Sequence, residues 1–421
     1  MHKFLIGCVA DDFTGASDLA SFLEEAGAKC LLINGLPDNS NMLTDDYDAV
    51  VIALKTRSIL PHDAVSQSLE AFSWLSNQKP RMLYFKYCST FDSTPTGNIG
   101  PVLDSLMDTY QLPYTILCPS LPVNERTVKN GILYVSGVPL GKSPMKNHPV
   151  NPMWDSFIPS LMKPQSSYPS YVIEEGLLVD EKKLHKRIKE WEGANAHFYL
   201  VPDYIDDEQG VKIAEVFQDM VLASGGSALP SHFYRVMTKH DFNKGNSVMR
   251  NLPNDSRVLI LSGSCSETTK KQICNYISSG NDAIYLSAQK LLTGEQTLEE
   301  VWEEILRQKG DLLVHSYNEN ELHTGIEQDK ISDVLENVVA ELGKRAIEHG
   351  IKNLIVAGGE TSGAVIQRLN VKSFEIGPSI APGVPILYPT GMPGIQIALK
   401  SGNFGDADFL NKGVYIMRKG K

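Results

Sequence analysis

The chain has 421 residues and a formal net charge of −11, with a hydrophobic share of 42% and a charged share of 21%. Its length is about three times that of a typical domain of ~150 residues, which favours two domains with sizeable cores. The acidic total argues against a protein that binds nucleic acid through a broad basic surface, but it leaves room for an anionic substrate in a locally basic cleft.

The cysteines and the first residues indicate a cytoplasmic protein. None of the six cysteines forms a CxxC pair, and several lie in apolar strand-like runs, which suits a reducing compartment. The first ten residues are typical of a buried strand ended by Asp11 and Asp12, and not of a signal peptide. No run approaches the ~18 apolar residues of a membrane helix, so we expect no membrane partner.

In the first half of the chain, short apolar runs alternate with helical patterns over residues 17–27 and 64–76. The strands expected there are FLIGCVA, KCLLIN, AVVIAL, MLYFKY, YTILCP, YVIEEG and HFYLVP. Runs that are apolar throughout predict parallel strands covered on both faces. Residues 131–172 are rich in proline and weakly periodic, which favours a long loop or lid.

A polar segment over residues 238–255 separates a second half with the same rhythm. Its expected strands are RVLILSG, AIYLSA, DLLVHS, NLIVAGG and PILYP, and its helices cover residues 267–279 and 334–349. We therefore predict an α/β protein of two domains, residues 1–245 and 246–421. Each would hold a mostly parallel sheet flanked by helices, with the active site in the interdomain cleft.

The first candidate site lies where the strand FLIGCVA ends in Asp11 and Asp12 and a helix begins at Thr14 and Gly15. Ligands of open α/β sheets bind beyond the carboxyl ends of the strands, near helix N-termini. Two carboxylates there could orient sugar hydroxyls, and Asp12 could accept a proton from an attacking hydroxyl. The alternative is a helix cap, which would explain one aspartate and leave the other without a role.

Cations follow the next strands of the first half. Arg57 comes after AVVIAL, and its guanidinium suits a carboxylate, although most arginines are solvated surface residues. Lys86 lies inside the apolar run MLYFKY, where a lysine needs an anionic ligand or a structural ion pair. Asp92 lies in the polar loop that follows, and His148 in the proline-rich segment, where a structural role is the alternative.

The second half carries glycine turns suited to phosphate. Gly358 and Gly359 follow the strand NLIVA and let backbone N–H groups approach phosphate oxygens, while Thr361 adds a hydroxyl. The alternative is a tight turn with a capping threonine. Ser264 follows RVLIL in the same way, and the loop around Gly402 could close over a nucleotide.

Two other nucleotide motifs are not matched. The sequence GVPLGKS over residues 137–143 has three residues between its glycines, whereas the Walker A loop has four. The first strand does not lead into G-x-G-x-x-G, which weakens a dinucleotide-binding interpretation.

Taken together, the motifs resemble the four-carbon acid sugar kinases over essentially the whole chain. They are ADDFTGASD (10–18), GGETSG (358–363), APGVP (381–385) and KSGNFG (400–405). Three further segments resemble the 3-oxo-tetronate kinase branch: FKYCSTFDSTPTGNIGP (85–101), MKNHPVNPM (145–153) and SGSCS (262–266). Lys146 stands where the family pattern is expected to carry an arginine.

The resemblance implies an N-terminal domain that binds the acid sugar and a C-terminal domain that binds ATP. The predicted substrate residues are Asp11, Asp12, Arg57, Lys86, Asp92 and His148, with Asp12 as the catalytic residue. The predicted ATP residues are Ser264, Gly358, Gly359, Glu360, Thr361 and Gly402. Mg²⁺ would bridge the phosphates, but the spacing of the sequence assigns no metal ligand.

The expected reaction is ATP-dependent phosphorylation of the C4 hydroxyl of a 3-oxo-tetronate. The alternatives are a D-threonate or D-erythronate 4-kinase, an NAD-dependent oxidoreductase acting on a small sugar acid, and a two-domain solute-binding protein. The expected partners are the sugar acid and ATP, and the oligomeric state is left open, with a homodimer as one option.

Overall fold

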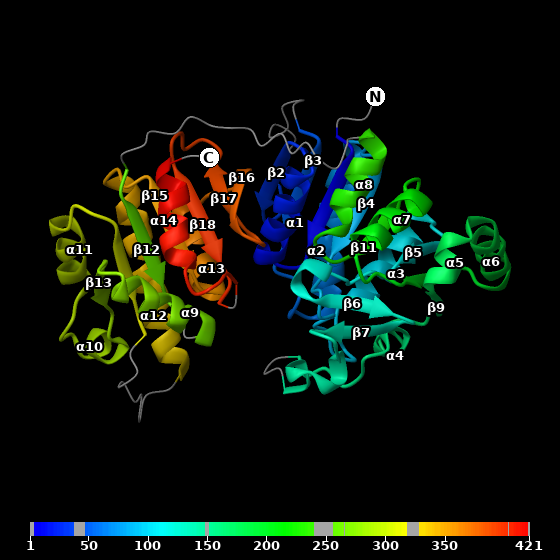
Figure 1. Cartoon of the computed structure of the whole chain (residues 1–421), viewed down its shortest axis with the longest axis horizontal. Coiled ribbons are helices and arrows are strands. Elements are labelled where there is room, and N and C mark those ends of the chain that lie inside the picture. The colour runs from blue at the N-terminus through cyan, green and yellow to red at the C-terminus, as the bar shows by residue number, and fades with distance from the viewer. Residues whose placement is uncertain are drawn as a thin grey trace. The chain divides into compact units, whose positions relative to one another are not determined.

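The computed structural model describes residues 4–37, 47–147, 151–239, 256–264, 266–317, 328–402 and 404–419. The chain divides into two compact units, Met1–Asn246 and Ser247–Lys421. Each unit contains a mostly parallel sheet with helices on its faces (Figure 1). The predicted fold class, α/β in two domains, is therefore confirmed.

The main sheet of the first unit has the order β11-β4-β1-β3-β2, and all its neighbouring strands are parallel. Its strands are β1 (Ile6–Ala10), β2 (Cys30–Asn34), β3 (Ala49–Ala53), β4 (Met82–Lys86) and β11 (Leu222–Gly225). β1, β3 and β4 are buried along their whole length, because helices cover both faces of the sheet. This explains why these runs are apolar throughout.

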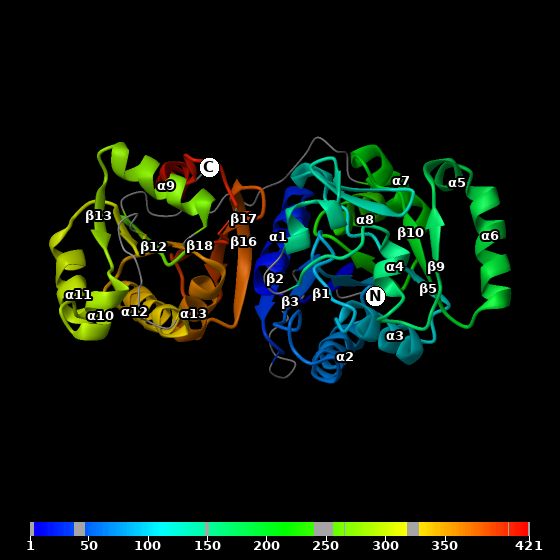
Figure 2. The same cartoon turned by 90° about the horizontal axis from the view of Figure 1, so that it is seen from below.

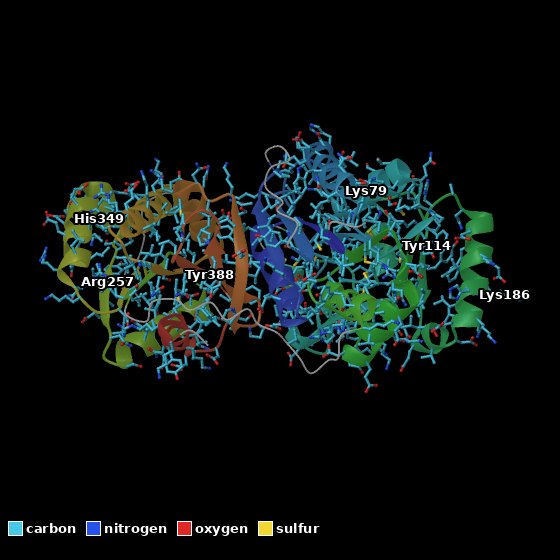
Figure 3. The ribbon with its side chains drawn as sticks, turned by 90° about the horizontal axis from the view of Figure 1, so that it is seen from above. Lys79, Tyr114, Lys186, Arg257, His349 and Tyr388 are labelled. Atoms are coloured by element: carbon cyan, nitrogen blue, oxygen red, sulfur yellow. The ribbon has the colours of Figure 1, made fainter. Side chains whose placement is uncertain are left out.

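Helices enclose this sheet in two layers (Figure 2), with α1 packed against α8 and α2 packed against α3. The helices of the unit are α1 (Phe13–Glu25), α2 (Pro61–Asn77), α3 (Ile99–Tyr110), α4 (Ile158–Met162), α5 (Glu175–Val179), α6 (Glu181–Ala194), α7 (Asp207–Phe217) and α8 (Leu229–Thr238). α6 buries Leu184 and Ile188 and carries Lys186 on its exposed side (Figure 3). Such an apolar stripe on a polar helix is typical of a surface layer.

The proline-rich segment is more regular than its sequence indicates. A parallel sheet of order β5-β10-β9 combines β5 (Tyr114–Ile116), β9 (Ser170–Ile173) and β10 (Phe198–Pro202). An antiparallel sheet combines β6 (Arg126–Lys129), β7 (Ile132–Val135) and β8 (Val138–Pro139). A 3-10 turn at Pro122–Asn124 precedes this sheet, and two more follow it at Leu140–Lys142 and Pro144–Asn147. The expectation of a long loop was wrong where these elements form. Three of the prolines lie at positions that need no backbone donor: Pro139 ends β8, Pro144 begins a 3-10 turn and Pro159 lies in the first turn of α4.

The second unit has a sheet of order β16-β17-β18-β15-β12-β14-β13, in which β17 runs antiparallel to β16 and β18 and the other pairs are parallel. Its strands are β12 (Val258–Ser262), β13 (Asp282–Tyr285), β14 (Leu312–His315), β15 (Asn353–Ala357), β16 (Ser373–Ala381), β17 (Val384–Pro389) and β18 (Gln396–Lys400). Tyr388 of β17, labelled in Figure 3, belongs to the hydrophobic core of this unit.

In this unit too, helices cover both faces of the sheet (Figure 2), with α12 packed against α13 and α9 against α14. The helices are α9 (Glu267–Ser278), α10 (Ala288–Thr293), α11 (Leu298–Arg307), α12 (Gln328–Glu348), α13 (Gly359–Leu369) and α14 (Phe409–Lys419). Among the helices formed by the described residues, none is long and apolar enough to cross a membrane.

In each of the two sheets, the connections between successive strands change direction at an interior strand. β1 lies between β3 and β4, and β12 lies between β14 and β15. At such a point the connections on either side of the strand lead away from each other and leave a crevice at the carboxyl ends. The strand order of each unit therefore provides one place where a ligand can approach the backbone.

Candidate functional site

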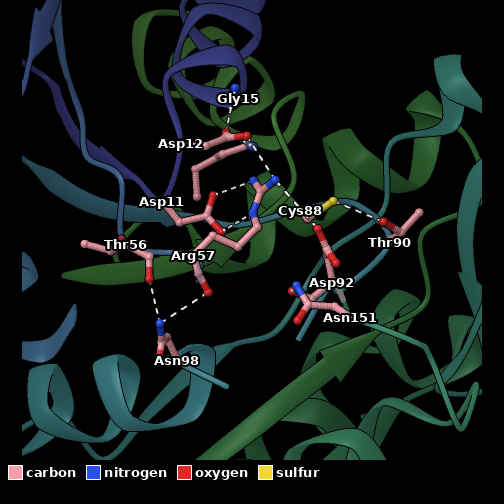
Figure 4. A network of polar contacts seen from close by, with 11 residues as sticks. Asp11, Asp12, Gly15, Thr56, Arg57, Cys88, Thr90, Asp92, Asn98 and Asn151 are labelled. Carbon is pink, nitrogen blue, oxygen red and sulfur yellow. Dashed lines mark hydrogen bonds and ion pairs between the residues drawn. The ribbon is translucent and has the colours of Figure 1, made fainter. Parts of the chain in front are cut away.

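The crevice of the first unit contains two aspartates held by one arginine (Figure 4). Arg57, which follows β3, donates from Nε and Nη2 to the two oxygens of Asp11 at 2.9 and 2.7 Å. Its Nη1 lies 3.0 Å from Oδ2 of Asp12. The predicted fork of Arg57 is thus occupied by Asp11, and the guanidinium joins the two carboxylates that end β1.

Lys86 approaches the same pair from the neighbouring strand. It is the last residue of β4, its side chain is 5% exposed, and its Nζ lies 3.5 Å from Oδ1 of Asp12. Room for this ammonium comes from Gly15 in the first turn of α1, where a Cβ would lie 1.6 Å from Nζ. Gly15 also donates its backbone N–H to Asp12 Oδ1 at 2.7 Å, so Asp12 caps α1 while facing both cations.

The charges around Asp12 keep it ionised. Burial alone would raise the pKa of its carboxyl, but Arg57, Lys86 and the amide of Gly15 outweigh burial and lower the pKa to about 2. Burial likewise opposes the charge of Arg57, whereas Asp11 and Asp12 raise its pKa well above the usual value. Asp12 therefore carries its charge at neutral pH and is available as a hydrogen-bond acceptor.

Asn98 and Asp92 contact the loop that carries Arg57. The side-chain amide of Asn98, just before α3, donates to the carbonyls of Thr56, Arg57 and Ile59 at 2.6, 3.2 and 3.0 Å. Asp92 Oδ2 lies 3.8 Å from Nη1 of Arg57. Asn98 was not predicted as a site residue, because an asparagine before a helix ordinarily acts as a helix cap.

A cavity of about 580 Å³ adjoins Arg57. Its wall combines apolar side chains, among them Ile59 and Leu60, with hydroxyls and amides. Its polar lining includes Ser58, Ser93, Thr94, Thr96, Asn98 and Asn151. A small molecule with several hydroxyl groups would find matching partners there.

Asp18 is a further buried carboxylate that sequence analysis missed. It lies one turn beyond Gly15 on α1, is 4% exposed, and its Oδ1 accepts no hydrogen bond from the described residues. Burial raises its pKa to about 6, against the hydrogen bond from Ser227 and the charge of Lys86. Above a pH of about 6 this carboxylate adds a buried negative charge that interacts with Lys86 and Asp12.

The glycine turns of the second unit also come together. Gly358 has φ 129°, a conformation that favours glycine, and a Cβ at this position would lie 2.8 Å from Thr361 Oγ1 and 3.3 Å from the amide of Ser264. The ends of β12 and β15 thus bring Gly358, Thr361 and Ser264 to one corner. Gly359 and the exposed Glu360 open α13 at the same corner.

The loop after β18 is tied to this corner. A Cβ at Gly402 would lie 2.9 Å from Ser264 Oγ. The Gly402 carbonyl accepts hydrogen bonds from the hydroxyls of Ser266 and Thr269, both in the first turn region of α9, at 2.5 and 2.9 Å. The ends of β12, β15 and β18 therefore meet at one place, which we call the glycine corner and which comprises Ser264, Gly358, Gly359, Thr361 and Gly402. Backbone amides at glycines and side-chain hydroxyls are groups that can approach phosphate oxygens closely.

The structure thus brings the predicted residues into two groups, one per unit. Asp11, Asp12, Arg57, Lys86 and Asp92 lie together in the first unit. Ser264, Gly358, Gly359, Glu360, Thr361 and Gly402 lie together in the second. His148 lies outside the described residues, and no set of three or more His, Cys, Asp or Glu side chains suited to a metal ion is found among the residues described. The active site between domains stays a prediction.

Two family models match the chain in succession. A model described as "Sugar-binding N-terminal domain" covers residues 6–233, and one described as "Nucleotide-binding C-terminal domain" covers residues 259–410. The aspartate–arginine cluster falls within the first match and the glycine corner within the second.

Two relatives that match over nearly the whole chain carry the same name. A Brucella melitensis protein named 3-oxo-tetronate kinase is 39% identical over 97% of this chain and 95% of its own. A Salmonella typhimurium protein of the same name is 39% identical over 96% and 97% of the two chains.

Two solved structures share the fold. The Haemophilus influenzae protein HI1011 matches with a TM-score of 0.83 at 36% identity, over 98% of this chain and 100% of that one. A Salmonella typhimurium LT2 protein, provisionally described as a tRNA synthase, matches with a TM-score of 0.86 at 38% identity, over 97% and 98% of the two chains. These matches support the architecture of both units.

Proposed function

Because this chain belongs to the four-carbon acid sugar kinase family, in its 3-oxo-tetronate kinase branch, we propose that it transfers the γ-phosphate of ATP to the C4 hydroxyl of a 3-oxo-tetronate. The product is 3-oxo-tetronate 4-phosphate. The observation that carries the proposal is the cluster of Asp11, Asp12, Arg57 and Lys86 at three adjacent strand ends, within a segment that matches a sugar-binding model.

Asp12 orients the attacking hydroxyl in this proposal. With a pKa of about 2 it is a weak base, but its carboxylate can accept a hydrogen bond from the C4 hydroxyl and aim the oxygen at the γ-phosphorus. Phosphoryl transfer has a loose transition state that needs positioning and charge neutralisation more than early deprotonation. Lys86 attracts the anionic substrate, while Arg57, which Asp11 holds, fixes the position of the Asp12 carboxylate.

The glycine corner of the second unit binds the nucleotide in this proposal. Backbone N–H groups at Gly358 and Gly359, with the hydroxyls of Thr361 and Ser264, are the donors that face phosphate oxygens. Gly402 borders the same corner. Transfer requires the γ-phosphate to reach the hydroxyl held by Asp12, so the ligands of the two units must meet during the cycle.

Mg²⁺ is part of the proposal. Mg²⁺ commonly takes one or two carboxylates together with phosphate oxygens and water, so a cluster of three protein ligands is not required. Glu360, exposed at the start of α13, is a carboxylate that fits this limited role. When bound, the ion would neutralise charge on the transferred phosphoryl group.

A direct test is ATP-dependent release of ADP across a panel containing 3-oxo-tetronate, D-threonate and D-erythronate, with phosphorus NMR to locate the new phosphate. We expect turnover to be fastest with the 3-oxo acid and the phosphate to be on C4. Reduction of a dinucleotide without ADP release would support the oxidoreductase alternative, which the names of the relatives do not favour. Binding without turnover would support the solute-binding alternative.

The cytoplasmic location and the homodimer belong to the same proposal. The cytoplasmic location fits a kinase of small metabolites, because its substrates ATP and sugar acids are present in the cytoplasm. Light scattering of the purified protein measures the oligomeric state, and a monomeric mass would contradict the homodimer.

A further inference from the structure

Lys400, the last residue of β18, is a buried cation that the proposed chemistry does not use. It is fully buried, and its Nζ donates to Thr269 Oγ1, the Ser401 carbonyl and the Gly402 carbonyl at 2.9, 2.9 and 3.0 Å. Among the described residues, no carboxylate forms an ion pair with it. An ammonium removed from water ordinarily needs an anion nearby, so the full complement of neutral acceptors leaves its charge unbalanced.

Lys400 lies next to the glycine corner in the sheet, so its charge is close to the proposed phosphate site. β18 runs parallel to β15, and Lys400 pairs with Ala357 at the carboxyl ends of both strands. The next residue, Gly358, donates its N–H to the Lys400 carbonyl at 2.8 Å. The ammonium and the glycine corner therefore lie at the paired ends of the adjacent strands β15 and β18.

The hydrogen bonds of Lys400 also determine the direction of a backbone donor. In a trans peptide the N–H points away from the preceding C=O. Because the Ser401 carbonyl accepts from Lys400, the N–H of Gly402 is directed away from the ammonium. The same residue borders Ser264 of the glycine corner. A backbone donor that points away from a positive charge lying behind it is an arrangement that attracts an anion.

We propose that Lys400 is a positioning residue of the nucleotide site, which supplies a buried positive charge to the phosphates and directs the Gly402 amide without itself touching the nucleotide. This inference rests on the proposed ATP-binding function of the second unit. Burial lowers the pKa of Lys400 to about 8, which is the expected behaviour of a cation whose counter-anion comes from a ligand.

The test compares nucleotides with and without phosphate. Lys400→Gln removes the charge but keeps an amide that can donate to the same carbonyls, and Lys400→Met removes both. The matched control is Lys372→Met, which removes an exposed lysine from the same unit. Affinities for ADP and for adenosine are measured by titration calorimetry and NMR, and circular dichroism checks the fold.

We expect Lys400→Gln to weaken ADP binding about tenfold or more while adenosine binding stays within about twofold, since only the phosphates interact with the charge. Lys372→Met should leave both affinities unchanged. Equal ADP affinity in wild type and Lys400→Gln, an equal loss for adenosine, or failure of both Lys400 variants to fold would overturn the inference in favour of a purely structural lysine. Failure of the wild-type protein to bind ADP would instead overturn the proposed function.

Discussion

The two oxygens of Asp12 face different partners. Oδ1 accepts the Gly15 amide and lies near Lys86, while Oδ2 lies 3.0 Å from Arg57. A single side chain therefore caps α1 and presents a fixed negative charge to the crevice. The two interpretations that its sequence left open, cap and site, are compatible because a carboxylate has enough lone pairs for both.

This dual role predicts the behaviour of Asp12→Asn. Asparagine is as good an N-cap as aspartate, so the cap is kept. The charge that Arg57 and Lys86 stabilise is lost, however, so stability should fall by about 2 kcal/mol, the size of a pKa shift from 3.8 to about 2. The lost charge should lower kcat about 100-fold or more, because an amide oxygen is a weaker acceptor for the hydroxyl in the transition state than a carboxylate. Steady-state ADP release and urea unfolding measure the two effects.

The control is Asp206→Asn, which alters the equivalent cap of α7, where Asp206 accepts the Gln209 amide at 3.0 Å. It should leave kcat unchanged. Turnover of Asp12→Asn close to that of wild type, with a normal fold, would remove Asp12 from the chemistry.

Asp18 predicts a dependence of stability on pH. Its pKa is raised from 3.8 to about 6 in the folded protein, so the folded state holds its proton over a range in which the unfolded state has lost it. This carboxyl therefore destabilises the fold increasingly as pH rises from about 4 to 6, and the cost stays constant above that range. Asp18→Asn should remove the cost, which is of the order of 2 kcal/mol for a shift of this size.

Urea unfolding at pH 5 and pH 7.5 tests this. Asp18→Asn should gain more stability over wild type at pH 7.5 than at pH 5, whereas the exposed control Glu192→Gln should show no such difference. A gain that is the same at both pH values would show that Asp18 carries its charge as easily in the folded state as in the unfolded state.

At the scale of elements, most of the strands that carry the site could be predicted, whereas β18 and several strands elsewhere could not. β1, β3, β4, β12 and β15 are unbroken apolar runs followed by polar turns, and that pattern is enough to predict a buried parallel strand with a functional end. β16 was missed because Gly377 and Pro378 interrupt it, and the structure accommodates them with a register shift between Ile376 and Ser379. β18 was missed because both ends, Gln396 and Lys400, are polar although buried.

The partners within the site could not be predicted either. Arg57 was expected to hold a substrate carboxylate, but its fork binds Asp11, a contact between residues that the sequence separates by 46 positions. Asn98 donates to three carbonyls of the loop around Arg57, and no local sequence pattern predicts these hydrogen bonds. Such contacts depend on tertiary geometry, which periodicity and turn signals do not encode.

The first turn of α1 predicts a separation of activity from stability. Gly15→Ala would place a methyl group 1.6 Å from Lys86 Nζ, so the flexible ammonium must move away from Asp12. Alanine favours a helix over glycine by roughly 1 kcal/mol, which offsets part of the cost of this movement. We expect kcat/KM for the acid to fall about tenfold or more, with a change in unfolding free energy of about 1 kcal/mol or less.

The matched control is Gly193→Ala in the last turn of α6, where a Cβ would meet no atom within 4 Å. It should not change kcat/KM. Wild-type kcat/KM in Gly15→Ala would show that Lys86 need not stay at its present position for the reaction.

At the scale of the whole molecule, each unit places its candidate ligand groups at the reversal point of its own sheet. Such separate crevices predict that the two ligands protect different parts of the backbone from hydrogen exchange. The sugar acid should slow exchange in the turns after β1, β3 and β4, and ADP in those after β12, β15 and β18. Mass spectrometry of exchanging protein, with each ligand added alone, measures this.

Protection of the turn at Asp11 by ADP alone, without any at Gly358, would contradict the division of roles between the units. Protection of neither turn by the sugar acid would contradict its assignment to the first unit.

The pairing of β11 with β4 has a consequence for how the first unit is assembled during synthesis. Leu222 pairs with Leu83, so most of the sequence of the unit, including both small sheets, lies between two strands that must become neighbours. Contacts this distant along the chain form slowly, because the loop must lose its entropy before the pairing is gained. A ribosome-bound chain that stops short of Gly225 would expose the hydrogen-bonding edge of β4. We therefore expect the unit to be prone to aggregation until β11 has been synthesised and paired with β4.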